Sequence, residues 1–207
     1  MMPMVSFTSV PRILRLALAG LALLVLGACG FHLKGATPLP FQSLYTNINL
    51  DSEFGARLRR TISANSPDTR FTDRRQDADV YLHQINESQN LRQLSLDADG
   101  RVEEYELNLE FQFELLDRTG HVLLPPTTLL SVRELPYNDR IVQAKEGEID
   151  RTFKDMRNSL IDQILRRMSS PEVRAAYADA ADRPVVPIPD DKVLEATPPA
   201  GPSSIRP

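Results

Sequence analysis

The residue best placed for chemistry is Cys29, the only cysteine in the 207-residue chain. It directly follows Leu26-Gly27-Ala28, and an apolar run over residues 16–26, preceded by two arginines, lies upstream. A charged segment, a short apolar run and a small-residue site are the parts of a secretory signal peptide. The run holds about 11 residues, well short of the roughly 18 that a membrane-spanning helix needs. Cleavage after Ala28 would therefore make Cys29 the first residue of the mature chain.

The four residues Leu26-Gly27-Ala28-Cys29 resemble the lipobox of bacterial lipoproteins, whose cysteine is acylated on its sulfur and on its amine after cleavage. The alternative is an ordinary signal peptide that ends at a cysteine by chance. One acyl chain, such as palmitate, holds a protein to a membrane only marginally, whereas two or more hold it firmly. In lipoproteins an aspartate after the cysteine favours the inner membrane. The residue here is Gly30, which predicts a lipid-anchored protein on the periplasmic face of the outer membrane.

The charge balance argues against a nucleic-acid-binding protein. Lys and Arg number 24 against 28 Asp and Glu. Removal of the leader takes away two arginines and no acid, which leaves 22 cations against 28 acids and a net charge of −6. Sequence-independent binding to nucleic acid depends on neutralising phosphates, so we expect no nucleic-acid partner. An acylated Cys29 also leaves no thiol for a disulfide.

The histidines form no catalytic or metal-binding pattern. His32, His83 and His121 are far apart, and there is no His-x-x-x-His pair and no second cysteine, so a zinc site would need distant parts of the chain. Motifs for a nucleophilic serine or a phosphate loop are missing from the sequence. We therefore expect a protein that is not an enzyme and has no cofactor. His83 lies in a predicted strand and is interpreted as a hydrogen-bonded structural residue.

The strongest periodicity runs from Glu104 to Leu115, where polar and apolar residues alternate without a break. Side chains on a strand switch faces at every residue, so this segment predicts a central strand with one apolar face and one wet, acidic face. Asp97-Ala98-Asp99-Gly100 predicts a hairpin turn before it. The spacing of its acids does not fit a calcium-binding loop.

Two segments have helical periodicity. The first is predicted to start at an N-cap in Asp51-Ser52, to bury Phe54, Leu58 and Ile62, and to stop at Asn65-Ser66-Pro67. The second runs from about residue 138 to residue 167. Its predicted buried stripe is Val142, Ile149, Phe153, Met156, Leu160 and Ile164, widened by Ile161 and Leu165. Its predicted outer face carries Asp150, Lys154, Asp155, Arg157 and Asp162.

Further strands are expected at 43–50, in two stretches within 80–96, and at 122–124 and 127–135 with Pro125-Pro126 between them. Residues 70–78 are charged and irregular, and 172–181 is a candidate short helix. These elements predict an α+β fold with two helices packed on one face of a small, mostly antiparallel four-stranded sheet. The predicted divisions are a signal peptide at 1–28, a lipidated tether at 29–42, a domain at 43–170 and a Pro-rich, disordered tail at 171–207.

The mature N-terminus, Cys29-Gly30-Phe31-His32-Leu33-Lys34-Gly35, resembles that of the LPS-assembly lipoproteins of the LptE (RlpB) family. The resemblance continues in Asp99-Gly100 followed by Glu104-Tyr105, in Ser131-x-Arg133 and in Ala144-Lys145-Glu146. It extends from Cys29 to about Met168. Each motif is loose alone, and it is their order and spacing that make the match specific.

The resemblance implies a plug and assembly factor inside the outer-membrane β-barrel LptD, in a pair that delivers lipopolysaccharide to the outer leaflet. It also implies contact with lipopolysaccharide, whose phosphates are natural ligands of basic side chains. Lys145 stands where the family has a basic residue of this contact. Some relatives carry an arginine before the Asp-Gly turn, where this chain has Ala98, and Arg101 after the turn is a candidate substitute. Arg92 and Arg133 are further candidates.

Two alternatives stay open at this point. Lys145 can be a solvated lysine at the start of a helix, and strand arginines are often simply surface residues. The protein as a whole can be a free periplasmic lipoprotein that binds peptidoglycan or a soluble ligand. That function would require a pocket or a basic groove facing water, whereas a plug requires a broad protein-contacting surface.

Overall fold

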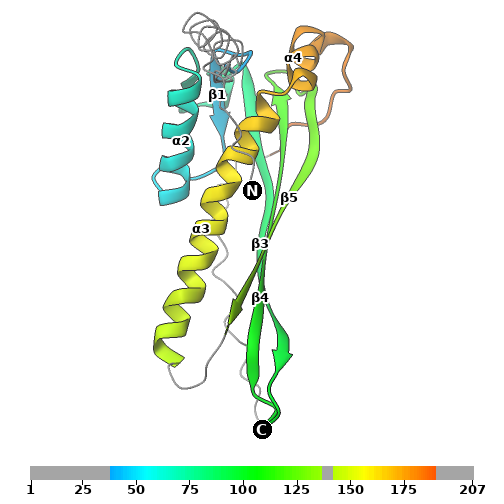
Figure 1. Cartoon of the computed structure of the whole chain (residues 1–207). Helices are drawn as coiled ribbons and strands as arrows, with labels where there is room; N and C mark the ends of the chain where they lie inside the picture. The colour runs from blue at the N-terminus through cyan, green and yellow to red at the C-terminus, as the bar shows by residue number, and fades with distance from the viewer. Residues whose placement is uncertain (1–37, 137–141, 190–207) are drawn as a thin grey trace, which may run out of the picture. The chain divides into compact units, whose positions relative to one another are not determined.

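The computed structural model describes residues 38–136 and 142–189, and within this part it has an α+β architecture (Figure 1). The strands are β1 (Ser43–Thr46), β2 (Arg70–Phe71), β3 (Val80–Leu96), β4 (Val102–Asp117) and β5 (Val122–Pro136). The α-helices are α2 (Glu53–Asn65), α3 (Val142–Met168) and α4 (Pro171–Ala178), with short 3-10 helices at Arg75–Asp77 and Ala180–Asp182.

The strands form one five-stranded mixed sheet in the order β2-β1-β3-β4-β5. β1 is parallel to both β2 and β3, whereas β3, β4 and β5 pair antiparallel. The predicted α+β class is confirmed, but the sheet is five-stranded and mixed, where four mostly antiparallel strands were predicted. The missed strand, β2, has only two residues inside a charged stretch, and so few residues show no periodicity.

Two predicted interruptions of the strands are absent. β3 is continuous and absorbs a register shift between Gln84 and Asn86, close to where two separate stretches were expected. β5 runs through Pro125-Pro126, where the register with β4 shifts between Phe113 and Leu115. Proline is tolerated at edge strands and bulges, and β5 is both an edge strand and bulged at this point.

The alternation predicted for β4 is confirmed. α2 and α3 cover one face of the sheet, which we call the helix face (Figure 1). The apolar side chains of the alternating stretch are buried on this face. The residues that define this face are Leu107, Leu109, Phe111, Phe113 and Leu115, each at most 1% exposed. Burial of one such side chain contributes about 1.5–3 kcal/mol. We call the opposite face the open face, and Glu104, Glu106, Asn108, Glu110 and Gln112 of β4 define it.

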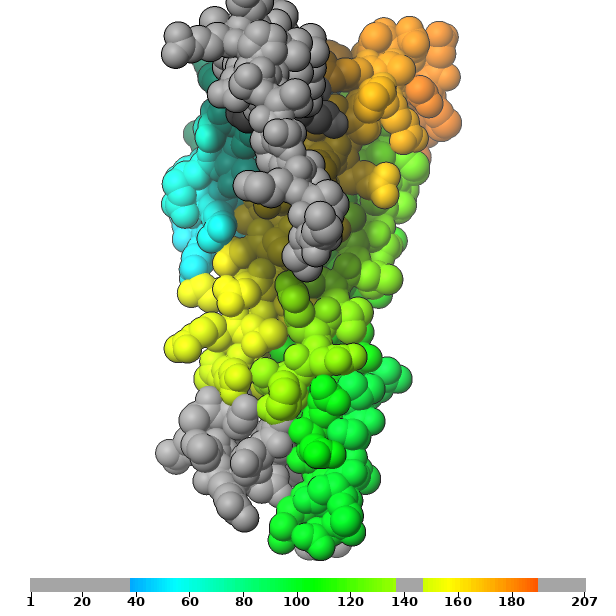
Figure 2. All heavy atoms as spheres, viewed as in Figure 1, coloured from blue at the N-terminus to red at the C-terminus, as the bar shows by residue number. Residues whose placement is uncertain are grey.

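The stripes predicted for both helices are buried wherever their side chains are described, and the side chain of Val142 lies outside that part. Ser52 caps α2, and its hydroxyl accepts a hydrogen bond from the Gly55 N–H at 3.0 Å. Within the described part of α3, the stripe is buried as predicted, with Ile149 and Leu165 at its half-buried margin and Met168 added at its end. Space-filling atoms show α3 (yellow) packed beside the strands (green), below α2 (cyan) (Figure 2).

The folded part extends beyond the predicted boundaries at residues 43 and 170. Leu39 and Phe41, placed in the tether, are buried in the core, and so are Val173 and Ala176 of α4. Arg183–Pro189, which we call the strap and which was expected to be disordered, bonds along the turn between β4 and β5. A few apolar side chains were enough to add residues 39–41 and α4 to the core, whereas the strap is held by backbone bonds and stays largely exposed.

Candidate functional site

The predicted basic residues gather at one end of the sheet. The β3–β4 turn lies beside the pair Leu96↔Val102, and the last residue of β5 pairs with Glu104 two positions further along β4. α3 begins at Val142, shortly after β5 ends. Arg92, Arg101, Arg133 and the backbone of Lys145 therefore belong to the same end, which we call the hairpin end (Figure 1).

The turn of the hairpin end has the predicted conformation. Asp97 Oδ1 accepts hydrogen bonds from the N–H groups of Asp99 and Arg101, both at 2.9 Å. Gly100 has φ 79°, a left-handed conformation that favours glycine. Arg101 Nη1 lies 3.5 Å from Asp99 Oδ2, and both side chains are mostly exposed. Such an exposed surface pair contributes little to stability.

Arg92 lies on the open face, because it pairs with Glu106 across β3 and β4. Its Nη2 donates to Glu106 Oε1 at 2.9 Å. The amide of Asn108 donates to the same oxygen at 2.8 Å. The hydrogen bond from Asn108, together with the charge and hydrogen bond of Arg92, holds the pKa of Glu106 below its ordinary value. Arg92 is thus already engaged by a carboxylate of the acidic row.

Arg133 lies on the opposite side, because its partner on β4 is Leu107, a helix-face residue. It is exposed and makes no hydrogen bond or ion pair with any residue that the structure describes. The backbone of Lys145 lies in the first turn of α3, but its side chain is outside the described residues. The structure therefore brings the four candidates to one end of the sheet and places Arg92 and Arg133 on different faces.

The open face of the hairpin end is acidic. Its charged side chains on the three long strands are Glu104, Glu106, Glu110, Glu134 and a single cation, Arg92. A phosphate would meet net repulsion there and a more favourable field beside Arg133. As predicted, the acidic row faces away from the helices. Glu114 is the exception, since it is buried and its Oε1 lies 2.8 Å from Nδ1 of His83.

His83 has the structural contacts that the sequence predicted. Besides Glu114, its ring stacks on Tyr81 with ring centroids 5.2 Å apart. Arg157 was predicted to lie on the outer face of α3, and this is wrong. Its Nε donates to Glu87 Oε1 at 2.8 Å, its Nη2 bonds the same oxygen, and its guanidinium lies over the Phe54 ring. No spacing in the sequence links Arg157 to Glu87, which is 70 residues away.

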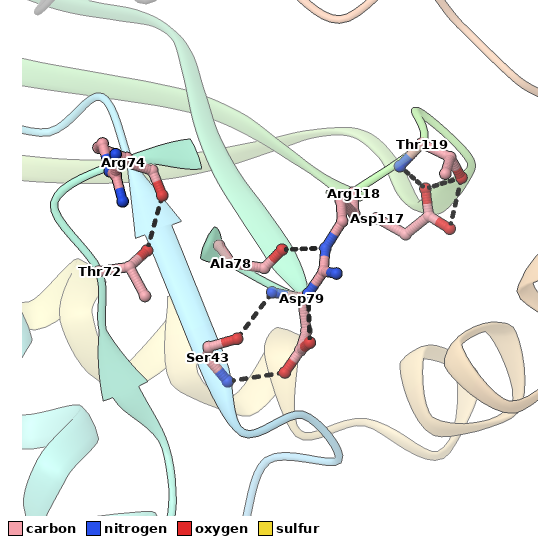
Figure 3. A network of polar contacts seen from close by, with 8 residues as sticks. All are labelled: Ser43, Thr72, Arg74, Ala78, Asp79, Asp117, Arg118 and Thr119. Carbon is pink, nitrogen blue, oxygen red and sulfur yellow. Dashed lines mark hydrogen bonds and ion pairs between the residues drawn. The ribbon is translucent and has the colours of Figure 1, made fainter. Parts of the chain in front are cut away.

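The opposite end of the sheet, which we call the closed end, holds a second polar network (Figure 3). Asp79 Oδ2 accepts from the Ser43 N–H at 3.0 Å, and Asp79 Oδ1 accepts from Arg118 Nη2 at 3.1 Å. The Arg118 Nε also donates to the Ala78 carbonyl. These bonds tie the start of β1 to the start of β3 and to the β4–β5 turn. Sequence reasoning missed the network because its members are distant in the chain.

A polar hollow of about 680 Å³ lies beside this network. Its lining includes Asp68, Arg70, Thr72 and Asp79. Asp79 is already hydrogen-bonded to Ser43 and Arg118, so it is poorly placed to bind a ligand.

Within residues 38–136 and 142–189, no group of three or more His, Cys, Asp or Glu side chains could hold a metal ion. No helix in that same part is long and apolar enough to cross a membrane. Cys29 and the signal segment lie outside the described residues.

Comparison with known proteins identifies the fold. The model of the LptE family, described as lipopolysaccharide-assembly, matches residues 39–168, more than half of the chain. The LPS-assembly lipoprotein LptE of Pectobacterium atrosepticum is 26% identical over 151 residues, 72% of this chain and 81% of that protein. Two solved structures are also similar to this chain. Lipoprotein B from Nitrosomonas europaea has TM-score 0.57 and 29% identity, covering 73% of this chain and 94% of that one. Rare lipoprotein B from Shewanella oneidensis has TM-score 0.55 and 27% identity, covering 64% of this chain and 98% of that one.

The family match covers the sheet, α2 and α3, which form most of the core and the hairpin end. The resemblance read from the N-terminal motif and the later motifs is confirmed at the level of the family, which is one of lipopolysaccharide-assembly lipoproteins and not a known enzyme family. α4 and the strap follow the matched region in the sequence. The chain belongs to the LptE family of lipopolysaccharide-assembly lipoproteins.

Proposed function

We propose that this protein is a lipoprotein of the outer membrane that plugs and helps assemble an LptD β-barrel and takes part in delivering lipopolysaccharide to the outer leaflet. It is held at the periplasmic face by acyl chains on Cys29. The observation that carries the proposal is the match of the LptE family across the core domain, residues 39–168. The lipobox-like Leu26-Gly27-Ala28-Cys29 supports the mode of attachment.

The surface of the domain suits the lumen of a barrel. Barrel interiors are polar, so a plug must offer polar groups over a broad area. The open face offers carboxylates, amides and hydroxyls from β3, β4 and β5, with two exposed apolar side chains on β5. A broad and mostly polar sheet face of this kind supports protein contact more than it supports the binding of a small ligand.

The proposed lipopolysaccharide contact centres on the helix-face side of the hairpin end. Arg133 is exposed there and makes no ion pair with another described residue, so its planar guanidinium can bind a phosphate through two hydrogen bonds. Lys145, in the first turn of α3, is the second candidate. Arg101, exposed beside the hairpin turn, ranks next. Arg92 ranks last because Glu106 already binds it within an acidic field.

The direct test is extraction of the intact lipoprotein from membranes in mild detergent, followed by identification of co-purifying proteins. We expect a stoichiometric outer-membrane barrel. A Cys29→Ser variant, which cannot take the thioether-linked lipid, serves as a matched control for the anchor. Recovery of the wild-type lipoprotein as a clean monomer would contradict the proposal.

The alternative function, a free lipoprotein that binds peptidoglycan or a soluble ligand, depends on the hollow near Arg70 and Thr72 at the closed end. That hollow is polar, but part of its lining is used in the Asp79 network. Binding of a soluble peptidoglycan fragment that an Arg70→Glu substitution abolishes would favour this alternative over the plug.

A further inference from the structure

The long strands of the sheet leave two outer edges at the hairpin end. β1 pairs with β3 only at Val80, Tyr81 and Leu82, so beyond this point the outer edge of β3 faces no described strand. β5 is the last strand on the other side. An unpaired edge presents a row of N–H and C=O groups that can template another strand, and natural proteins usually blunt such edges.

The edge of β3 is blunted. Its register with β4 shifts between Gln84 and Asn86, between Gln93 and Ser95, and between Ser95 and Leu96. β-Bulges of this kind twist a strand and disrupt the regular row of edge groups. The sequence of this part, Asn86 to Gln93, is also almost entirely polar. Both features discourage pairing with another chain.

The edge of β5 over Thr127–Leu135 lacks both the bulges and the almost entirely polar sequence that protect β3. Its register with β4 is unbroken from the pair Phe113↔Thr127 to the pair Glu104↔Pro136. The prolines of β5 lie outside Thr127–Leu135, and Leu130 and Val132 on its open face are 66% and 54% exposed. At about 3.3 Å per residue, these nine residues give a regular edge of roughly 30 Å.

The same edge already accepts a strand at its closed end. The strap forms an antiparallel bridge between Val185 and His121. The Val122 N–H donates to the Pro184 carbonyl and the Val186 N–H to the Gly120 carbonyl, both at 2.9 Å. This pairing stops before Thr127. No backbone hydrogen bond joins Thr127–Leu135 to any described segment other than its neighbour β4.

We propose that the β5 edge over Thr127–Leu135 binds an extended segment of the partner protein by β-strand addition. For the identity of that partner, the barrel, the inference rests on the proposed function. Main-chain hydrogen bonds provide the affinity in this mode of binding, and alternate side chains provide the specificity. The added strand carries apolar side chains beside Leu130 and Val132 and a basic side chain beside Glu134.

Charge selects this occupant over a second copy of the chain. Edge-to-edge pairing of two copies would join two open faces, each with Glu104, Glu106, Glu110 and Glu134 against Arg92 alone. Like charges at this density repel, whereas a basic strand is attracted. On the helix face, Arg133 would stand beside an acidic residue of the added strand, so this arginine has a role in partner choice as well as a candidate role in phosphate binding.

The test uses the full-length lipoprotein in membranes with Val132→Lys as the edge variant. Asn90→Lys is the matched control, because Asn90, Asn108 and Val132 form one row across the open face and Asn90 lies at the blunted edge. Both positions are exposed, so thermal unfolding of the two variants should match the wild type. We expect Val132→Lys to lower barrel recovery roughly tenfold, as for a central contact, and Asn90→Lys to leave it within about twofold.

A photo-crosslinking residue at position 132 identifies the occupant independently. A crosslink from position 132 to the barrel supports the inference, and a crosslink to a second copy or to lipopolysaccharide alone overturns it. Equal barrel recovery with Val132→Lys and Asn90→Lys also overturns it, while leaving the proposed function intact. Failure of the wild type to co-purify with any barrel overturns the proposed function, and the inference with it.

Discussion

The two ends of the sheet differ in how many of their side chains are buried. At the closed end, consecutive residues such as Tyr81 and Leu82 on β3, and Leu115 and Leu116 on β4, are all buried, so both faces of the sheet are covered. At the hairpin end, buried and half-buried residues alternate along β4, and Leu94, Leu96, Leu130 and Val132 on the neighbouring strands remain exposed. The closed end is therefore buried on both faces, whereas the hairpin end buries its helix face and leaves its open face exposed.

Truncation of a core aromatic should give the largest effect. Phe113→Ala removes a fully buried side chain of β4 and should lower the free energy of unfolding by about 3–5 kcal/mol. Leu130→Ala, at the exposed edge of the hairpin end, should change it by less than about 0.5 kcal/mol. Urea unfolding followed by circular dichroism measures both. Similar losses in the two variants would remove the distinction between the ends.

The ion pair between α3 and β3 should rank second. Arg157→Ala would leave Glu87, whose side chain is only 6% exposed, without its cation. Loss of one partner of a buried pair costs about 3–5 kcal/mol, and we expect about 2–3 kcal/mol because Arg157 itself is partly exposed. The control is Lys154→Ala, which breaks an exposed pair with Glu53 and should cost less than about 1 kcal/mol. If urea unfolding gave the same loss of free energy for Arg157→Ala and Lys154→Ala, Glu87 would behave as a solvent-exposed carboxylate, which would contradict this prediction.

The buried core and the Glu87–Arg157 ion pair differ in how well the sequence predicts them. The alternation of β4 and the stripes of α2 and α3 were predictable, because burial on one face imposes a period on the sequence. The contact between Glu87 and Arg157 was not, because it depends on how α3 crosses the sheet. β2 was missed for another reason. Backbone bonds from Arg70 to Gln42 and from Thr72 to Leu44 hold this two-residue strand, so it needs no sequence pattern of its own.

The candidate lipopolysaccharide site likewise has features that the sequence predicts and features that only the folded structure shows. The Asp-Gly turn and the basic candidates could be read from the sequence, whereas the faces on which the candidates lie depend on register. A shift of one residue moves a strand side chain to the other face. Arg92 and Arg133 were equivalent in the sequence, and only the pairs Arg92↔Glu106 and Leu107↔Arg133 separate them.

Acid should weaken the closed end through Asp117. Burial raises the pKa of its carboxyl, but hydrogen bonds from the backbone and side chains of His121 and Thr119 lower the pKa by more, so it lies below the ordinary value. A depressed folded pKa stabilises the protein above the ordinary pKa of about 4, and this contribution is lost as the pH falls through the folded value. We expect Asp117→Asn to lower the free energy of unfolding by about 1 kcal/mol at pH 6.

The difference between wild type and Asp117→Asn should shrink as the pH falls from about 5 to 2.5, since the wild-type carboxyl then becomes protonated. Chemical unfolding at each pH measures it. A difference that is constant over this range would show that the hydrogen bonds of Asp117 do not depend on its charge.

The last expected effect concerns ligand binding and sharpens the division within the hairpin end. Arg133→Glu should weaken binding of purified lipopolysaccharide by roughly fivefold to tenfold, because it replaces an exposed cation on the helix-face side with an anion. Arg92→Ala should change binding by less than about twofold, since Glu106 already holds that side chain. Titration with fluorescent lipopolysaccharide compares them, and the reverse order would move the contact to the open face.

The most direct test of this division is amide hydrogen exchange of the full-length lipoprotein, alone and with its barrel partner. The account predicts that added protection concentrates on the β5 edge, Thr127–Leu135, and on the hairpin turn. Slow exchange at the buried strands of the closed end, such as β3 from Val80 to Leu82, should be the same in both samples. Added protection confined to the closed end, with none at Thr127–Leu135, would contradict the account.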